Sequence, residues 1–190
     1  MKKCKDLSKA GFSLIELIIT IAIMAILASS IIGMMAYIGN AKARKGSELL
    51  NSKLDTILVS TMSKDTSTNG YYMYVFKDGD EYKAVIDNTL GQDGATNSSA
   101  VTSTIKKKGF VIPGNIKMYF GVSGGKTEIS GDILKIGYNK ADGSFKVCQL
   151  GGDFSTINDF TTATIYLEGS DGKFQIKMIK TTGRHTLTKK

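Results

Sequence analysis

The chain has 190 residues, with 25 lysines and arginines against 17 aspartates and glutamates, and it contains one histidine and two cysteines. This length allows one anchoring segment and one further domain of about 130 residues with a modest core. A lone histidine, His185, excludes a histidine-based metal cluster, and because Arg44 and Arg184 are the only arginines, sequence-specific nucleic-acid contacts are disfavoured.

The first predicted element is an uncharged run over residues 17–41, which follows a basic leader. As a helix it would extend about 37 Å, which is enough to cross a bilayer core. Only a helix satisfies all the backbone hydrogen bonds of a single segment within the bilayer. The run is longer than the apolar core of an ordinary signal peptide. We therefore predict a membrane-spanning helix over residues 12–40.

One carboxylate, Glu16, stands at the beginning of this apolar run. A carboxylate in a membrane costs about 3 kcal/mol, and no lysine or arginine follows within a helical turn to pair with it. If the chain were cut after Gly11, Phe12 would carry a free amine. The amine of a neighbouring subunit would then be a partner for Glu16 in poorly screened surroundings.

The segment Gly11-Phe12-Ser13-Leu14-Ile15-Glu16-Leu17, with aliphatic residues after it, resembles the class III signal of type IV pilins and type II secretion pseudopilins. The resemblance implies a leader, residues 1–11, that a prepilin peptidase removes in the cytoplasm before it methylates the nitrogen of Phe12. It also implies that Glu16 pairs with the terminal amine of an adjacent subunit. Major pilins commonly have proline where this chain has Gly33, so the resemblance favours a minor subunit.

Loss of the leader would change both the charge and the cysteine content. The leader holds four lysines and one aspartate, so the net side-chain charge would fall from +8 to +5, and Cys148 would be the remaining cysteine. No internal disulfide could form, and the exported domain would depend on its core. We expect Cys148 to be a small buried hydrophobic residue, with intermolecular pairing as the alternative.

The helix is predicted to continue as an amphipathic second half over residues 41–62. Leu50, Leu54, Ile57 and Leu58 recur at spacings of three and four, which indicates one apolar face for packing on a following domain. The polar run 64–70 then ends the helix.

Residues 63–190 are predicted to form a β-rich head domain. Tyr72, Tyr74 and Phe76 alternate, and Asp78-Gly79 turns the chain into a second alternating run, which predicts a hairpin. Residues 87–104 are predicted to form a long surface loop. Further strands are predicted at residues 116–120, 134–138, 145–147, 165–167 and 174–178, with a short one after Gly183. The predicted class is α+β, with a long N-terminal helix packed on an antiparallel sheet as in pilins.

The remaining candidate residues have ordinary structural interpretations. The sequence contains no phosphate-binding loop and no convincing Ser/His/Asp set, so we expect neither an enzyme nor a cofactor. His185 is expected to be solvated. Tyr71, Tyr72 and Tyr74 are interpreted as part of a sheet face, with stacking on bases or sugars as the alternative.

The leading hypothesis is a structural subunit of a type IV pilus-like extracellular filament, minor rather than major. It would be held in the cytoplasmic membrane by one helix before assembly and lie at the cell surface afterwards, with the prepilin peptidase and other pilin subunits as partners. The first alternative is a DNA-binding minor pilin of an uptake machine, motivated by Arg184, Lys189 and Lys190 near the end of the chain. The second is an adhesive subunit that contacts a host surface through residues 87–104.

Overall fold

The computed structural model describes residues 13–63, 70–88, 103, 106–113, 116–151, 160–169 and 172–190. The predicted cleavage site Gly11-Phe12, most of the run 64–70 and most of the loop 87–104 lie outside these residues. The chain divides into two compact units, with the boundary between Tyr37 and Ile38.

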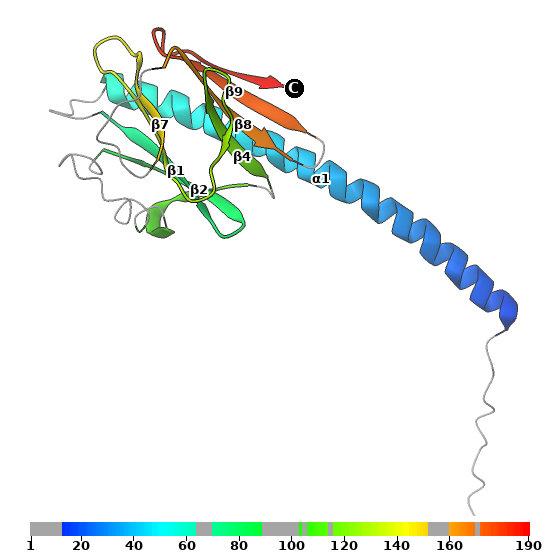
Figure 1. Ribbon diagram of the computed structural model, residues 1–190. Coiled ribbons are helices and arrows are strands. Elements are labelled where there is room, and N and C mark those ends of the chain that lie inside the picture. The colour runs from blue at the N-terminus through cyan, green and yellow to red at the C-terminus, as the bar shows by residue number, and fades with distance from the viewer. Residues whose placement is uncertain are drawn as a thin grey trace, which may run out of the picture. The chain divides into compact units, whose positions relative to one another are not determined.

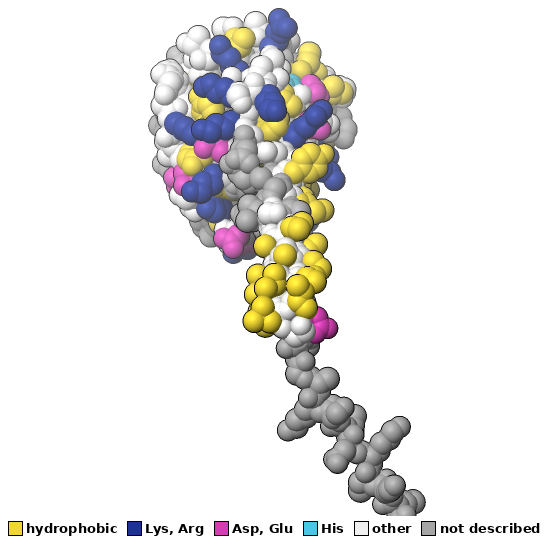
Figure 2. All heavy atoms as spheres, turned by 90° about the vertical axis from the view of Figure 1, so that its right-hand side faces the viewer, with side chains coloured by type: hydrophobic (Ala, Val, Ile, Leu, Met, Phe, Trp, Pro, Cys, Tyr) yellow, Lys and Arg dark blue, Asp and Glu magenta, His cyan; other side chains and the backbone are white. Residues whose placement is uncertain are grey.

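The first unit is the beginning of helix α1, which spans Leu14–Ser63. The prediction of one helix over residues 12–62 is thus confirmed within two residues at its start, and the helix passes through Gly33 without a break. Large apolar side chains from Leu14 to Leu27 are all more than half exposed, and they point in every direction around the helix. Figure 2 shows such side chains covering the visible face of this segment.

Within the described residues, no helix has both the length and the apolar content needed to cross a bilayer. The span over residues 12–40 stays a prediction.

The second unit contains the rest of α1 and the strands, which form two sheets where one was predicted. Within the described residues, each sheet has five strands, and all neighbouring strands are antiparallel. The first sheet has the order β3 (Phe110–Ile112), β2 (Glu81–Asp87), β1 (Tyr72–Asp78), β6 (Leu134–Tyr138), β7 (Phe145–Leu150). The second has the order β10 (His185–Lys189), β9 (Lys173–Ile179), β8 (Thr162–Glu168), β4 (Lys117–Val122), β5 (Thr127–Glu128).

A shared core explains why the strands divide in this way. The predicted apolar face of α1 is confirmed, because Leu50, Leu54 and Ile57 are fully buried. They belong to one cluster with Met73 and Ile136 of the first sheet and with apolar residues of β4, β8 and β9 from the second. Figure 1 shows the second half of α1 running along both sheets. The apolar faces of both sheets are buried in this one core, whereas one continuous sheet would leave apolar strand faces exposed to solvent.

The predicted strands are all present, and two strands were missed. The Asp78-Gly79 hairpin between β1 and β2 is confirmed, as is the hairpin between β8 and β9. The missed strands are β3, with three residues, and β5, with two, which are too short to show an alternating pattern.

The alternation of Tyr72 and Tyr74 marks the face of the first sheet that points away from the main core. These tyrosines form a smaller cluster with Val85, Ile133 and Val147. Tyr74 is fully buried and Tyr72 is 6% exposed, so neither ring is a free platform for a base or sugar. The interpretation as a sheet face is therefore confirmed for Tyr72 and Tyr74, whereas Tyr71 lies before β1 and is partly buried against the main core.

Candidate functional site

Helix α1 begins with the Glu16 half of a capping box. The backbone N–H of Ser13, the residue before the helix, donates a hydrogen bond to Glu16 Oε2 at 3.3 Å. The N–H of Leu17 donates to the Ser13 carbonyl at 3.2 Å and closes the first turn. A carboxylate at the third helical position satisfies an otherwise unpaired donor and lies at the positive end of the helix dipole.

This backbone bond gives Glu16 a local partner that the search for a nearby lysine or arginine did not consider. The signal was present in the sequence, since Ser13 and Glu16 have the Ser-x-x-Glu spacing of a capping box. A carboxylate accepts hydrogen bonds through two oxygens, so the bond to Ser13 is compatible with a further donor from a neighbouring subunit.

Polar side chains within the apolar segment bond to their own helix. The hydroxyl of Thr20 donates to the carbonyl of Leu17 at 2.9 Å, and that of Ser29 donates to the carbonyl of Ile26 at 2.8 Å. Both hydroxyls therefore have partners without water. These two hydroxyls are thus satisfied within the helix, although the side chains around them are apolar and exposed.

His185 lies inside the second unit, which contradicts the expectation that it is solvated. Its side chain is 5% exposed, and its Nε2 lies 3.1 Å from Asp55 Oδ1 of α1. Its Nδ1 lies 3.2 Å from the hydroxyl of Tyr138 in β6. Pairing with β9 places His185 opposite the buried Met178, so the strand turns this side chain toward the core. The sequence contained no signal for this, because the pairing is between distant segments.

The Asp55-His185-Tyr138 arrangement resembles a catalytic relay but lacks an accessible nucleophile. Tyr138 is 1% exposed, and burial, with a smaller contribution from Asp55, raises the pKa of its hydroxyl. The Tyr138 hydroxyl and the two imidazole nitrogens thus form a continuous chain of contacts to the Asp55 carboxylate. The arrangement joins α1, β6 and β10, and we assign it a structural role.

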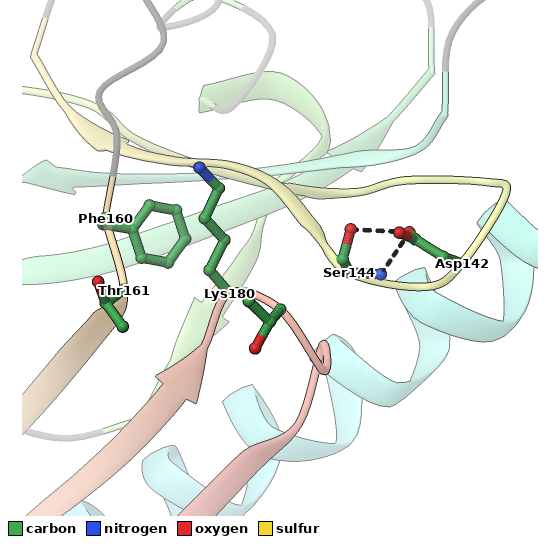
Figure 3. A pocket seen from close by; sticks show the side chains of 6 residues that line it. Asp142, Ser144, Phe160, Thr161 and Lys180 are labelled. Atoms are coloured by element: carbon green, nitrogen blue, oxygen red, sulfur yellow. Dashed lines mark hydrogen bonds between the residues drawn. The ribbon is translucent and has the colours of Figure 1, made fainter.

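A shallow pocket of about 450 Å³ lies where the β6–β7 and β9–β10 turns meet the start of β8 (Figure 3). Asp142 Oδ1 accepts hydrogen bonds from the backbone N–H of Ser144 at 3.0 Å and from its hydroxyl at 2.7 Å. These bonds lower the pKa of Asp142. Lys180 Nζ lies 5.8 Å from the centre of the Phe160 ring. Asp142 and Ser144 thus bond to each other within the β6–β7 turn, in the pattern of an Asx turn that fixes the local backbone.

The three basic residues near the end of the chain do not form one patch. Arg184 and Lys190 lie just outside the two ends of β10, about 20 Å apart at roughly 3.4 Å per residue. Lys189 points to the opposite side of the strand from Lys190. The backbone N–H of Lys190 donates to the carbonyl of Lys173 at 2.8 Å, so Lys190 lies beside β9.

Two further expectations concern cysteine and metals. Cys148 is 1% exposed and lies 4.0 Å from the sulfur of Met178, as expected for a small buried hydrophobic residue. Among the described residues, no group of three or more histidine, cysteine, aspartate or glutamate side chains is arranged to hold a metal ion.

Comparison with known proteins gives one match. Residues 7–32 match the family model of the prokaryotic N-terminal methylation motif, which is the class III signal of type IV pilins and pseudopilins. The resemblance stated from residues 11–23 is thereby confirmed. The motif supports a pilin-like or pseudopilin protein that is processed by a prepilin peptidase and assembles with other pilin subunits. It implies a membrane-anchored precursor and then a surface filament. No curated protein and no solved structure gives a significant match.

Proposed function

We propose that this chain is a structural, non-catalytic subunit of a type IV pilus-like filament, and a minor one. The observation that carries the proposal is the methylation motif at residues 7–32, which coincides with the beginning of α1. In this function, the leader is removed after Gly11, the helix anchors the precursor in the membrane, and the second unit forms the exposed head.

The apolar surface of the first unit supports an assembly role. A helix that is apolar on all sides is stable only where other apolar groups surround it, either lipid or neighbouring helices. Side chains such as Ile18, Ile21 and Met24 are 53%, 59% and 70% exposed in the isolated chain. Transfer from lipid into a bundle of pilin helices would keep these side chains buried in both states.

Intact mass measurement of the membrane-extracted protein tests the processing step. We expect a mature chain that begins at Phe12 and carries one methyl group on its nitrogen. Gly11→Val should leave the leader attached, because the predicted cleavage site would be lost. A mature chain that begins at Met1, or one cut after the apolar segment, would overturn the proposal.

Immunogold labelling of sheared filaments tests whether the subunit is minor. A minor subunit should give sparse label or label at filament tips, whereas continuous label along the shaft would show a major subunit. Absence of label from filaments that contain other pilins would contradict a role in assembly.

The alternatives receive less support. Arg184, Lys189 and Lys190 do not form one patch, so the DNA-binding alternative loses the arrangement that motivated it. Most of the loop 87–104, on which the adhesive alternative depends, lies outside the described residues.

A further inference from the structure

Two turns of the second unit pack against α1 just after the apolar segment ends. A Cβ built on Gly169, in the β8–β9 turn, would lie 3.0 Å from Ala43 Cβ and 3.1 Å from the Gly39 carbonyl oxygen. A Cβ on Gly46 would lie 3.1 Å from the carbonyl oxygen of Pro113, between β3 and β4. The buried face of α1 around residues 39–46 is therefore contacted by segments that adjoin strands of both sheets.

Basic side chains gather at this end of the unit. Lys117 and Lys173 both lie directly opposite Glu168 in the register of β4, β8 and β9. Lys126 Nζ lies 2.7 Å from Glu168 Oε1, and Lys190 is bonded to Lys173 through the backbone. The basic collar is defined as these residues and those on the adjoining turn of α1, all exposed: Lys42, Arg44, Lys45, Lys117, Lys126, Lys173 and Lys190.

The few acidic groups here do not neutralise the collar. Glu48 pairs with Arg44 at 2.8 Å, and Glu168 pairs with Lys126. The hydrogen bond from Lys126, with smaller contributions from Lys173 and Lys117, lowers the pKa of Glu168, as expected for a carboxylate among several cations. Among the described residues, the seven basic side chains of the collar stand against these two acidic ones, so the collar carries a net positive charge.

The position of the collar along the chain indicates its partner. Lys42 directly follows the uncharged run 17–41, so a membrane that holds this run must have its surface within a few residues of the collar. A lysine or arginine near an anionic bilayer surface contributes about 1 kcal/mol, and the attraction decays over roughly 8–10 Å. Three collar residues lie on α1, Lys117 and Lys173 begin strands β4 and β9, Lys126 lies in the β4–β5 turn, and Lys190 follows β10. Their partner Glu168 directly precedes Gly169, which contacts α1 at Gly39 and Ala43.

We propose that the basic collar docks on anionic lipid head groups of the membrane that holds the subunit before assembly. This inference rests on the proposed function, because it needs the apolar segment to be anchored in the bilayer. Docking holds the head against the membrane and restricts its tilt, and entry into a filament requires that these contacts be released. Anionic lipid is favoured over a free polyanion because the collar begins at Lys42, directly after the uncharged run that the proposed function places in the bilayer.

Amine acetylation, read out lysine by lysine with mass spectrometry, tests the inference on the full chain in vesicles. One set of vesicles contains only neutral phosphatidylcholine, and the other contains added phosphatidylglycerol. We expect acetylation of Lys117, Lys173 and Lys190 to slow several-fold with phosphatidylglycerol and to recover at high salt. The exposed Lys140, in the β6–β7 turn, should react equally in both.

Two variants of equal charge provide a matched control. The collar variant carries Lys117→Gln, Lys173→Gln and Lys190→Gln, and the control variant carries Lys140→Gln, Lys180→Gln and Arg184→Gln. Protection of the remaining collar residues Lys42 and Lys45 by phosphatidylglycerol should weaken in the collar variant and persist in the control variant.

Resistance to carbonate extraction separates failure of the inference from failure of the proposed function. Lipid docking by the collar is overturned if the chain resists carbonate extraction but the collar lysines are acetylated equally in both kinds of vesicle. It is also overturned if phosphatidylglycerol protects Lys140 as strongly as it protects the collar lysines. In both cases the anchoring step of the proposed function stands. If carbonate removes the chain from both vesicles, the anchoring step of the proposed function fails, and this inference fails with it.

Discussion

Gly183 and Gly79 provide a matched pair for testing how closely two turns of the head must approach. Both glycines have a φ of +64°. A Cβ on Gly79, in the β1–β2 turn, would have nothing within 4 Å. A Cβ on Gly183, before β10, would lie 1.9 Å from the Gly143 carbonyl oxygen in the β6–β7 turn. Replacement by alanine therefore imposes the same backbone strain at both positions, and a clash at Gly183 alone.

The structure gives the size of the expected difference. Alanine in the left-handed region costs about 1–2 kcal/mol, which is the whole expected loss for Gly79→Ala. At Gly183 the turns must also separate by about 1 Å to reach the 3.0 Å that real Cβ contacts respect. That movement disturbs the bond from the Phe145 N–H to the Lys180 carbonyl and displaces the neighbouring His185. We expect a total loss of about 3–5 kcal/mol for Gly183→Ala.

Thermal unfolding of the full chain in mild detergent checks these values. Near-UV circular dichroism follows the head, because the Tyr138 ring stacks on that of Phe145 with 4.4 Å between the ring centres. At about 2–4 °C per kcal/mol, Tm should fall by about 3 °C for Gly79→Ala and about 10 °C for Gly183→Ala. Equal losses in the two variants would refute the close approach of the two turns.

Three further predictions concern single side chains. Glu16→Gln keeps an acceptor for the Ser13 N–H, whereas Glu16→Ala removes it. Both variants should be cleaved normally and should enter filaments poorly. Normal assembly of the glutamine variant would show that Glu16 acts only as a helix cap. His185→Ala leaves the buried Tyr138 hydroxyl without its imidazole partner and should lower the free energy of unfolding in urea by about 2–4 kcal/mol. Adding Tyr138→Phe to this variant should partly restore stability if the two residues are coupled. Cys148 should resist alkylation in the folded chain and react on unfolding, because burial raises the pKa of its thiol; rapid labelling of the native protein would contradict its burial.

Features that depend on neighbouring residues were predictable from the sequence. The long helix and its apolar face follow from residues three and four positions apart, and the strand positions follow from alternation within five to seven residues. The motif at the beginning of α1 is likewise local, which is why the resemblance and the family match coincide. The capping role of Glu16 belongs to the same class, although its spacing from Ser13 was overlooked.

Features that depend on which distant segments pair were decided by the tertiary structure. The alternation of β1 has apolar side chains on both of its faces, so the pattern alone did not show whether Tyr72 or Met73 faces the main core. His185 is the one residue of its type in a polar segment, and its burial follows from the register between β10 and β9.

The distribution of charge shows the same division. The surplus of basic residues was countable from the sequence, and its concentration was not, because Lys42, Lys117, Lys173 and Lys190 are separated by up to 148 positions. Strand register and the packing of two turns on α1 bring these lysines to one end of the head, while Arg184, only six positions before Lys190, lies at the far end of β10. Along an extended strand each residue adds about 3.4 Å, so residues close in the sequence are soon far apart. Strand pairing instead places residues from distant segments about 5 Å apart. Sequence separation is therefore a poor guide to distance in the sheets.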